Sequence, residues 1–192
     1  MKIGILSLQG AVEPHIKMVA ALGVDCVRVR LPAHLVGLSG IILPGGESST
    51  MLHLLELNQL WNPLDQFLDQ KPALGVCAGA ILLADKVSHP EQKSFKKVGI
   101  SAERNSYGRQ NESFIETLTP TEHWTGEPNP PGIFIRAPRL KITNMKARPL
   151  LRFGQDDVLI EQDHWLAGSY HPELTESKSV HEYFLSKCQN HG

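Results

Sequence analysis

The sequence predicts an α/β fold with a parallel central sheet and helices on both of its faces. Two observations support this prediction. Short apolar, β-rich runs alternate with helical patterns through the first half of the 192 residues, which is the order that builds parallel βαβ units. Proline and glycine punctuate the ends of these runs, as at Pro44-Gly45-Gly46. Right-handed crossovers between parallel strands then place helices on both faces of the sheet.

The first half of the chain contains four predicted strands and three predicted helices. The strands are short apolar or alternating runs, at 2–8, 24–29, 40–46 and 73–76. Helical spacing of apolar residues follows three of the strands, at 11–22, 48–57 and 77–84. Gly23 is expected to end the first helix.

The second half is expected to consist mainly of short strands joined by loops. The strand-like runs lie at 113–118, 132–137, 140–143, 157–162 and 165–171. A closing helix is predicted at 175–188. The proline- and glycine-rich segment 126–132 is interpreted as a surface loop and not as a linker, so we expect one domain over residues 1–192.

Composition excludes several classes of function. The formal net charge is −1, from 19 basic and 20 acidic residues, and no basic run indicates nucleic acid or an anionic membrane. The apolar start of the chain covers only about seven residues, which is too short to span a membrane, and it lacks a cleavage pattern. A cytoplasmic protein is therefore expected.

The cysteines and histidines do not form a recognisable metal motif. Cys26, Cys77 and Cys188 lie far apart in the sequence, which argues against a disulfide framework and against a cysteine zinc site. The nine histidines include no HExxH pattern. No metal and no cofactor are expected.

Cys77 is the candidate nucleophile. It stands between Gly75 and Gly79 at the predicted strand-to-helix turn in ALGVCAGAILLA. Gly-x-Cys-x-Gly resembles the nucleophile elbow Gly-x-Ser-x-Gly, in which a sharp turn leaves no space for neighbouring side chains. A helix start favours thiolate, and N–H groups such as that of Ala78 can hold an oxyanion. The alternative is a packed cysteine whose glycines permit close helix–strand contact.

His171 and Glu173 are the candidate base and its orienting carboxylate. Both lie in GSYHPEL, after an apolar strand-like run, and Pro172 stiffens the turn between them. A thiol nucleophile needs a proton carrier, and a histidine needs a partner that orients its ring. The alternative is a loop histidine beside a surface glutamate. Among the other histidines, His164 is the strongest rival.

The segment LPGGESS at 43–49 is a glycine turn between a predicted strand and a predicted helix. Gly45 and Gly46 can offer backbone N–H groups, and Ser48 can cap the helix. No Gly-Lys-Ser/Thr follows, which disfavours a phosphate loop. Beside a nucleophile elbow, the turn suits half of an oxyanion hole. A plain turn with an N-cap is the alternative.

Together these segments resemble the class I, triad-type glutamine amidotransferases. The matching motifs are PGGES, GVCAG and SYHPEL. Four further segments, LSLQGAVEPH, AERNSYGRQNESF, GIFIRAP and HPELTE, narrow the resemblance to the glutaminase subunits of pyridoxal 5′-phosphate synthases. The resemblance covers nearly the whole chain. It implies a flavodoxin-like three-layer sandwich with a mostly parallel central sheet, whereas the segments 85–97 and 119–131 match no motif.

The resemblance also implies roles for individual residues. Cys77 would attack the side-chain amide of L-glutamine, His171 would transfer protons, and Glu173 would hold the imidazole. The backbone N–H groups of Gly46 and Ala78 would form the oxyanion hole. The residues implied in glutamine binding are Gly46, Glu47, Ser48, Arg104, Ile135 and Arg136. A guanidinium can bind the α-carboxylate of a free amino acid in a fork.

A second protein subunit is implied as well. In these enzymes the ammonia passes to a synthase subunit, a separate (β/α)₈ barrel, and glutaminase activity is restricted to the complex. Gln9 and Gly10 follow the first predicted strand and, by the resemblance, lie near the oxyanion hole. Because glycine permits a peptide flip, we hypothesise that docking of the barrel reorients the 9–10 peptide and completes the oxyanion hole.

Three other functions are compatible with parts of the pattern. A different synthase partner, such as one that makes imidazole glycerol phosphate, is disfavoured by ERNSYGRQ and FIRAP. Another cysteine enzyme on a flavodoxin-like fold, such as a small glyoxalase or a chaperone-like protein, would lack the His-Pro-Glu element. A regulatory subunit without activity is disfavoured because Cys77, His171 and Glu173 are all present.

Overall fold

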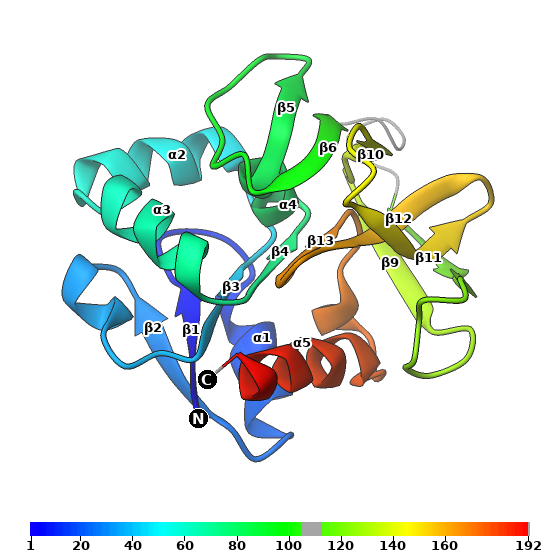
Figure 1. The fold of residues 1–192 in the computed structure, drawn as a ribbon, viewed down its shortest axis with the longest axis horizontal. Coiled ribbons are helices and arrows are strands. Elements are labelled where there is room, and N and C mark those ends of the chain that lie inside the picture. Colours follow the sequence, from blue (N-terminus) through cyan, green and yellow to red (C-terminus); the bar gives the residue numbers. More distant parts are fainter. Residues whose placement is uncertain (105–112, 192) are drawn as a thin grey trace.

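An eight-stranded sheet forms the centre of the protein in the computed structural model, which describes residues 1–104 and 113–191 (Figure 1). Its strands follow the order β2-β1-β3-β4-β13-β12-β11-β8. In that order they are Asp25–Val29, Lys2–Leu6, Gly40–Leu43, Ala73–Val76, Trp165–Gly168, Asp156–Gln162, Arg148–Phe153 and Thr119–Pro120.

The sheet is parallel on one side and antiparallel on the other. β2, β1, β3, β4 and β13 pair in parallel, whereas β12, β11 and β8 extend the sheet with antiparallel pairs. Strands of the parallel part alternate between two hydrophobic clusters. In β1, for example, Ile3 and Ile5 face one cluster and Leu6 faces the other. This two-sided burial explains why β1, β3 and β4 are almost entirely apolar, whereas the edge strand β2 carries the exposed Asp25 and Arg28.

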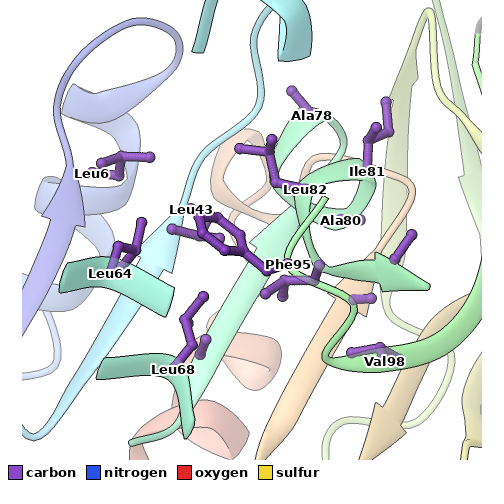
Figure 2. Close-up of a cluster of buried hydrophobic side chains, with 14 of the residues drawn as sticks. Leu6, Leu43, Leu64, Leu68, Ala78, Ala80, Ile81, Leu82, Phe95 and Val98 are labelled. Carbon is purple, nitrogen blue, oxygen red and sulfur yellow. The ribbon is translucent and has the colours of Figure 1, made fainter. Parts of the chain in front are cut away.

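Helices cover both faces of the sheet, as the sequence predicts (Figure 1). One face carries α1 (Val12–Ala20) and α5 (Ser179–Asn190), which pack through Val19, Val180 and Phe184. The other face carries α2 (Ser48–Leu57), α3 (Trp61–Gln70) and α4 (Ala78–Leu83). Figure 2 shows part of this second cluster, in which side chains of α4 lie near Leu43 of β3 and Phe95. The predicted α/β sandwich is therefore confirmed.

Smaller elements surround this sandwich. β5 (Ala84–Ser88), β6 (Val98–Glu103) and β10 (Arg139–Ile142) form a three-stranded sheet, and β7 (Ser113–Thr117) pairs with β9 (Pro131–Ile135). Two 3₁₀ turns, η1 (Pro32–Leu35) and η2 (Pro172–Leu174), complete the described elements.

The structure adds elements that the sequence analysis did not predict. These are η1, α3, β5, β6, β8 and β11. The predicted closing helix at 175–188 begins later, at Ser179, because Pro172–Leu174 forms η2 and a short loop follows. Most of the motif segment 102–114 lies outside the described residues. Within residues 1–104 and 113–191, no helix is long and apolar enough to cross a membrane.

Candidate active site

Four neighbouring parallel strands deliver the predicted site residues to one edge of the sheet. The strand order places β1, β3, β4 and β13 side by side. Their carboxyl ends lead into Gln9-Gly10, Gly45-Gly46, Cys77 and His171, respectively. Sites in α/β sheets form at these ends. The topology therefore brings together residues that are up to 162 positions apart in the sequence, as the numbers of Gln9 and His171 show.

Cys77 occupies a strained turn between β4 and α4. Its backbone has φ 50° and ψ −102°, a conformation that non-glycine residues rarely adopt. The Cys77 N–H donates a 2.7 Å hydrogen bond to the Gly168 carbonyl of β13, which fixes the turn on the neighbouring strand. Cys77 is only 6% exposed, and its side chain lines a cavity. Backbone strain of this kind is typical of a nucleophile elbow.

Gly75 and Gly79 lie where there is no room for a side chain. A Cβ on Gly75 would lie 2.6 Å from the carbonyl oxygen of Gly79, and a Cβ on Gly79 would lie 2.7 Å from the carbonyl carbon of Leu43. Both neighbours are backbone atoms that cannot rotate away. The steric reason that the sequence analysis gives for Gly-x-Cys-x-Gly is therefore confirmed.

His171 and Glu173 form a buried pair directly after β13. The His171 N–H donates a 2.7 Å hydrogen bond to the Ile133 carbonyl, which anchors the turn to β9. The His171 Nδ1 and Glu173 Oε1 atoms are 2.7 Å apart, and both side chains are almost completely buried. Pro172 begins η2 and turns Glu173 back toward the imidazole. The ring of His171 packs against Gly45, where a Cβ would lie 3.0 Å from Nδ1.

The electrostatic surroundings of His171 favour its protonated form. Burial lowers the pKa of His171, but hydrogen bonds and charge interactions with Cys77 and Glu173 outweigh burial and raise the pKa to about 10. His171 therefore lies between Cys77 and Glu173 in the order of a catalytic triad.

The loop after β1 packs on the glycine turn after β3. The Ala11 N–H donates a 2.9 Å hydrogen bond to the Gly45 carbonyl, and Gln9 Oε1 accepts a 2.9 Å hydrogen bond from the Glu47 N–H. Gly10 has φ +100°, and a Cβ there would collide with the Gly45 carbonyl. Gln9 and Gly10 thus touch the turn that contains Gly46, in line with the proximity that the resemblance implies.

One cavity gathers most of the predicted residues. It is lined by Ala11, Gly45, Gly46, Glu47, Ser48, Cys77, Ile81, Arg104, Ile135, Arg136, His171 and Leu174. Its volume of about 190 Å³ is below the range of about 300–1,000 Å³ that is usual for drug-sized ligands, so it suits a molecule of amino-acid size. Ala78 does not line the cavity but is the first residue of α4, where an N–H has no acceptor within the helix.

Charged and polar side chains that line this cavity form hydrogen bonds with one another and with Gln92. Arg104 Nη2 donates a 2.8 Å hydrogen bond to Glu47 Oε1, and the Arg104 side chain is only 11% exposed. Ser48 Oγ donates a 2.8 Å hydrogen bond to Gln92 Oε1. Arg136 has φ +46° and follows β9 directly. The two hydrogen bonds join the turn at 47–48 to residues that lie 44 and 57 positions away in the sequence.

Several residues at the site were missed by the sequence analysis. Ala11, Ile81 and Leu174 line the cavity, and Gln92 lies in the segment 85–97 that matched no motif. The positions of Ala11 and Leu174, beside Gly10 and Glu173, were the available signal. Nothing in the sequence around Gln92 indicates its contact with Ser48.

The histidines outside the motif take different places. His164 contacts the Leu68 carbonyl and the ring of Trp165, away from the cavity. His53 is exposed on α2. His15 is buried. Its Nε2 atom lies 3.7 Å from Glu173 Oε2, a proximity that the sequence analysis did not predict.

Comparisons with known proteins agree with this geometry. The model of the SNO glutamine amidotransferase family matches residues 5–190. The chain is 42% identical over 190 residues to the pyridoxal 5′-phosphate synthase subunit PdxT of Dictyoglomus turgidum, with 98% of this chain and 99% of that chain covered. It is 43% identical over 189 residues to the PdxT of Solibacter usitatus, with 97% and 98% covered. A crystal structure of a glutamine amidotransferase superposes with a TM-score of 0.89 at 37% identity, covering 97% of this chain and 98% of the other. The chain belongs to the SNO glutamine amidotransferase family.

Proposed function

We propose that this chain is the glutaminase subunit of a pyridoxal 5′-phosphate synthase and hydrolyses L-glutamine to L-glutamate and ammonia. The observation that carries the chemistry is the arrangement of Cys77, His171 and Glu173 at the edge of a cavity of amino-acid size. The choice of synthase is supported by the PdxT subunits that match this chain over nearly their whole length. We further propose that residues 1–192 act as one domain.

In the first half-reaction, the Cys77 sulfur attacks the side-chain amide carbon of glutamine. The carbonyl electrons move to oxygen, and the N–H groups of Gly46 and Ala78 hold the resulting oxyanion. The carbon–nitrogen bond then breaks while protonated His171 gives a proton to the amide nitrogen. Ammonia leaves, and a γ-glutamyl thioester remains on Cys77.

In the second half-reaction, water releases glutamate. Neutral His171 takes a proton from water, and the oxygen attacks the thioester carbon through a second oxyanion. The carbon–sulfur bond breaks and Cys77 returns as thiolate beside protonated His171. Glu173 holds the imidazole in one orientation through both steps, by the 2.7 Å contact with Nδ1.

The rim residues supply substrate recognition. Arg104 and Arg136 carry the positive charge that the α-carboxylate of glutamine needs, and Glu47 carries the negative charge that suits its α-ammonium group. Ser48 and Ile135 also line the cavity. Glu47 and Arg104 pair with each other, which keeps both charges at the cavity where the two charged groups of glutamine would bind.

The partner that we propose is a (β/α)₈ synthase barrel that receives the ammonia. Ammonia released into water at neutral pH becomes ammonium, which is a poor nucleophile, so direct transfer needs a docked complex. We propose a cytoplasmic location because Cys77 must remain a free thiol, and the cytosol keeps thiols reduced.

We also propose that docking controls the oxyanion hole through Gln9 and Gly10. The support is their contact with the turn at 45–47, where Gln9 accepts from the Glu47 N–H and Gly10 lies against the Gly45 carbonyl. Gly10→Ala should reduce barrel-stimulated turnover, because a Cβ at this position collides with Gly45 and φ +100° disfavours alanine. Unchanged stimulation by the barrel would contradict this control.

The test is glutamate release from glutamine with and without the purified synthase barrel. Hydrolysis that appears on mixing and disappears in Cys77→Ala supports the triad and the partner, and the variant should still dock. Ammonium salts should let the barrel run without this chain. Hydrolysis that persists in Cys77→Ala excludes the covalent mechanism, and absence of hydrolysis under both conditions excludes this synthase as the partner.

A further inference from the structure

A buried pair of histidines lies behind the catalytic carboxylate. Glu173 is fully buried in its side chain, and its Oε1 atom is bound by His171. Its second oxygen, Oε2, has no hydrogen-bond partner among residues 1–104 and 113–191. A buried carboxylate oxygen without a hydrogen-bond partner lowers the stability of the folded state. A neighbouring group that donates a hydrogen bond to Oε2 would restore that stability.

His15 of α1 is placed to serve this oxygen. Its Nε2 atom lies 3.7 Å from Glu173 Oε2, and this nitrogen is also buried without a partner in the described part of the chain. The distance is too long for a hydrogen bond. The two unpaired atoms are nevertheless close enough that a movement of less than about 1 Å would bring them within the usual range.

His181 of α5 holds the other side of the His15 ring. His15 Nδ1 and His181 Nε2 are 3.0 Å apart, and both side chains are fully buried. The chain of contacts therefore runs from His181 through His15 and Glu173 to His171. Its members come from α5, α1 and the segment after β13, which pack on the same face of the sheet (Figure 1).

Both histidines of this pair are neutral at pH 7. Burial lowers the pKa of His15 well below its usual value, and the repulsion between its protonated ring and protonated His181 or His171 lowers it further. Burial lowers the pKa of His181 to about 4. A neutral imidazole has one donor and one acceptor nitrogen, so the proton between the two rings can belong to either His15 or His181.

The Glu173 carboxylate decides between these two arrangements. If His15 Nδ1 carried the proton, the lone pair of its Nε2 would face the lone pairs of Oε2, which is repulsive. If His181 Nε2 donates to His15 Nδ1, the Nε2–H of His15 faces the carboxylate, which is attractive. The second arrangement satisfies both contacts with neutral rings.

We propose that His15, held by His181, is a positioning residue that donates its Nε2–H to Glu173 Oε2 in the reacting enzyme. With both oxygens bound, the carboxylate cannot rotate away from His171, and the imidazole stays aligned with Cys77. The role of His15 in glutamine hydrolysis rests on the function proposed above. The direction of the His181–His15 hydrogen bond is independent of that function.

The kinetic test uses the complex with the synthase barrel. His15→Leu should lower kcat for glutamine hydrolysis about tenfold, the effect of losing one hydrogen bond to a charged group, with less than a twofold change in KM. His15→Gln should recover activity, because its amide nitrogen can donate near the former position of Nε2. Tyr170→Phe is the matched control, since the Tyr170 hydroxyl is also buried without a described partner, and it should leave kcat unchanged.

Three kinetic results would overturn the proposal. They are a His15→Leu enzyme as active as wild type, a His15→Gln enzyme as slow as His15→Leu, and a loss of kcat in Tyr170→Phe alone, which would make Tyr170 the second donor. Melting temperatures of the variants identify any that fail to fold.

A second measurement is independent of activity. Nitrogen-15 NMR of the imidazoles in the wild-type chain should show neutral His15 protonated at Nε2 and unprotonated at Nδ1. Protonation at Nδ1 would overturn the proposal even in an active enzyme. If wild-type enzyme and barrel release no glutamate, the proposed function fails, while this NMR result still decides the donor.

Discussion

Replacement of Gly79 by alanine sets two physical effects of opposite sign against each other. Gly79 is the second residue of α4, and alanine is the better helix former by about 1 kcal/mol. The same Cβ would lie 2.7 Å from the carbonyl carbon of Leu43 and 2.8 Å from the Leu43 Cβ. Helix propensity therefore predicts stabilisation, whereas packing against β3 predicts destabilisation.

The packing effect is expected to be larger. Overpacking costs about 1–3 kcal/mol, and the upper end applies here because backbone atoms of a central strand cannot move aside. With about 1 kcal/mol recovered from propensity, the net loss is about 2 kcal/mol. A chain of 150–250 residues loses about 2–4 °C in Tm for each kcal/mol, so Tm should fall by about 4–8 °C.

The assay is thermal unfolding, with Gly168→Ala as the control. Gly168 is also a buried glycine at the site edge of the sheet, but the nearest atom to its Cβ would be 3.4 Å away, an ordinary contact. Its substitution should change stability by less than about 1 kcal/mol. A Gly79→Ala chain that melts at or above the wild-type temperature would refute the packing argument. Any displacement of Leu43 should also lower kcat, since Pro44, Gly45 and Gly46 follow it.

The remaining predictions concern the chemistry of the site. Arg104→Ala should raise KM for glutamine at least tenfold with a smaller change in kcat, because Arg104 lines the cavity beside Glu47 and a charge-assisted hydrogen bond to the substrate is lost. Steady-state kinetics of the complex measure KM and kcat. An unchanged KM would contradict this prediction. Glu173→Ala should lower kcat less than His171→Ala does, because orienting the ring is secondary to transferring the proton. The reverse ranking in the same assay would contradict the roles proposed for His171 and Glu173. The pKa of His171 is raised to about 10 from about 6.5 in an unfolded chain, so its stabilising contribution is complete below about pH 6.5 and is lost as the pH rises through about 10. The difference in unfolding free energy between wild type and His171→Gln should therefore shrink between about pH 7 and pH 10.5 in urea titrations, and a constant difference would exclude the raised pKa.

The first half of the fold was predictable because its signals are local. β4 and α2 have the predicted bounds, since continuous apolar runs and helical spacing both show within a few residues. The same signals were available at α3, where Trp61, Leu64 and Leu68 are buried at helical spacing, and at β6, where Val98, Ile100 and Ala102 are buried alternately. These two elements were missed although their patterns could have revealed them.

β11 and the order of strands depend on contacts between distant residues. β11 contains Pro149, and its pairing with β12 shifts register on both sides of Leu151, so it lacks a regular alternating pattern. The insertion of β13 beside β4 joins residues that are about ninety positions apart, such as Gly168 and Val76. No local pattern specifies such a pairing, because it depends on which surfaces remain uncovered once the other strands have paired.

The candidate site was predictable where a reactive residue lies at or directly after the end of a predicted strand and is next to proline or two positions from glycine. Cys77 and His171 both meet this condition. His15 does not, since a histidine at helical spacing in the sequence shows neither its burial nor the approach of Glu173 and His181. Gln92 is similar, because its contact with Ser48 depends on how the segment after β5 returns over α2. Residues that contact the motif residues from other parts of the chain are thus revealed only by the fold.

Under the proposed function, the fold separates the residues assigned to the chemistry from those assigned to substrate recognition. Cys77 and His171 follow strands of the parallel sheet, whereas Arg104 follows β6, which belongs to the smaller sheet. That sheet is tied to the nucleophile, because α4 ends at Leu83, β5 begins at Ala84, and β6 pairs in parallel with β5. The Arg104 N–H extends this pairing with a 3.2 Å hydrogen bond to the Ser88 carbonyl. α4 therefore has Cys77 at one end and the strands that lead to Arg104 at the other. Under the proposed function, this helix would align a bound glutamine with the Cys77 sulfur.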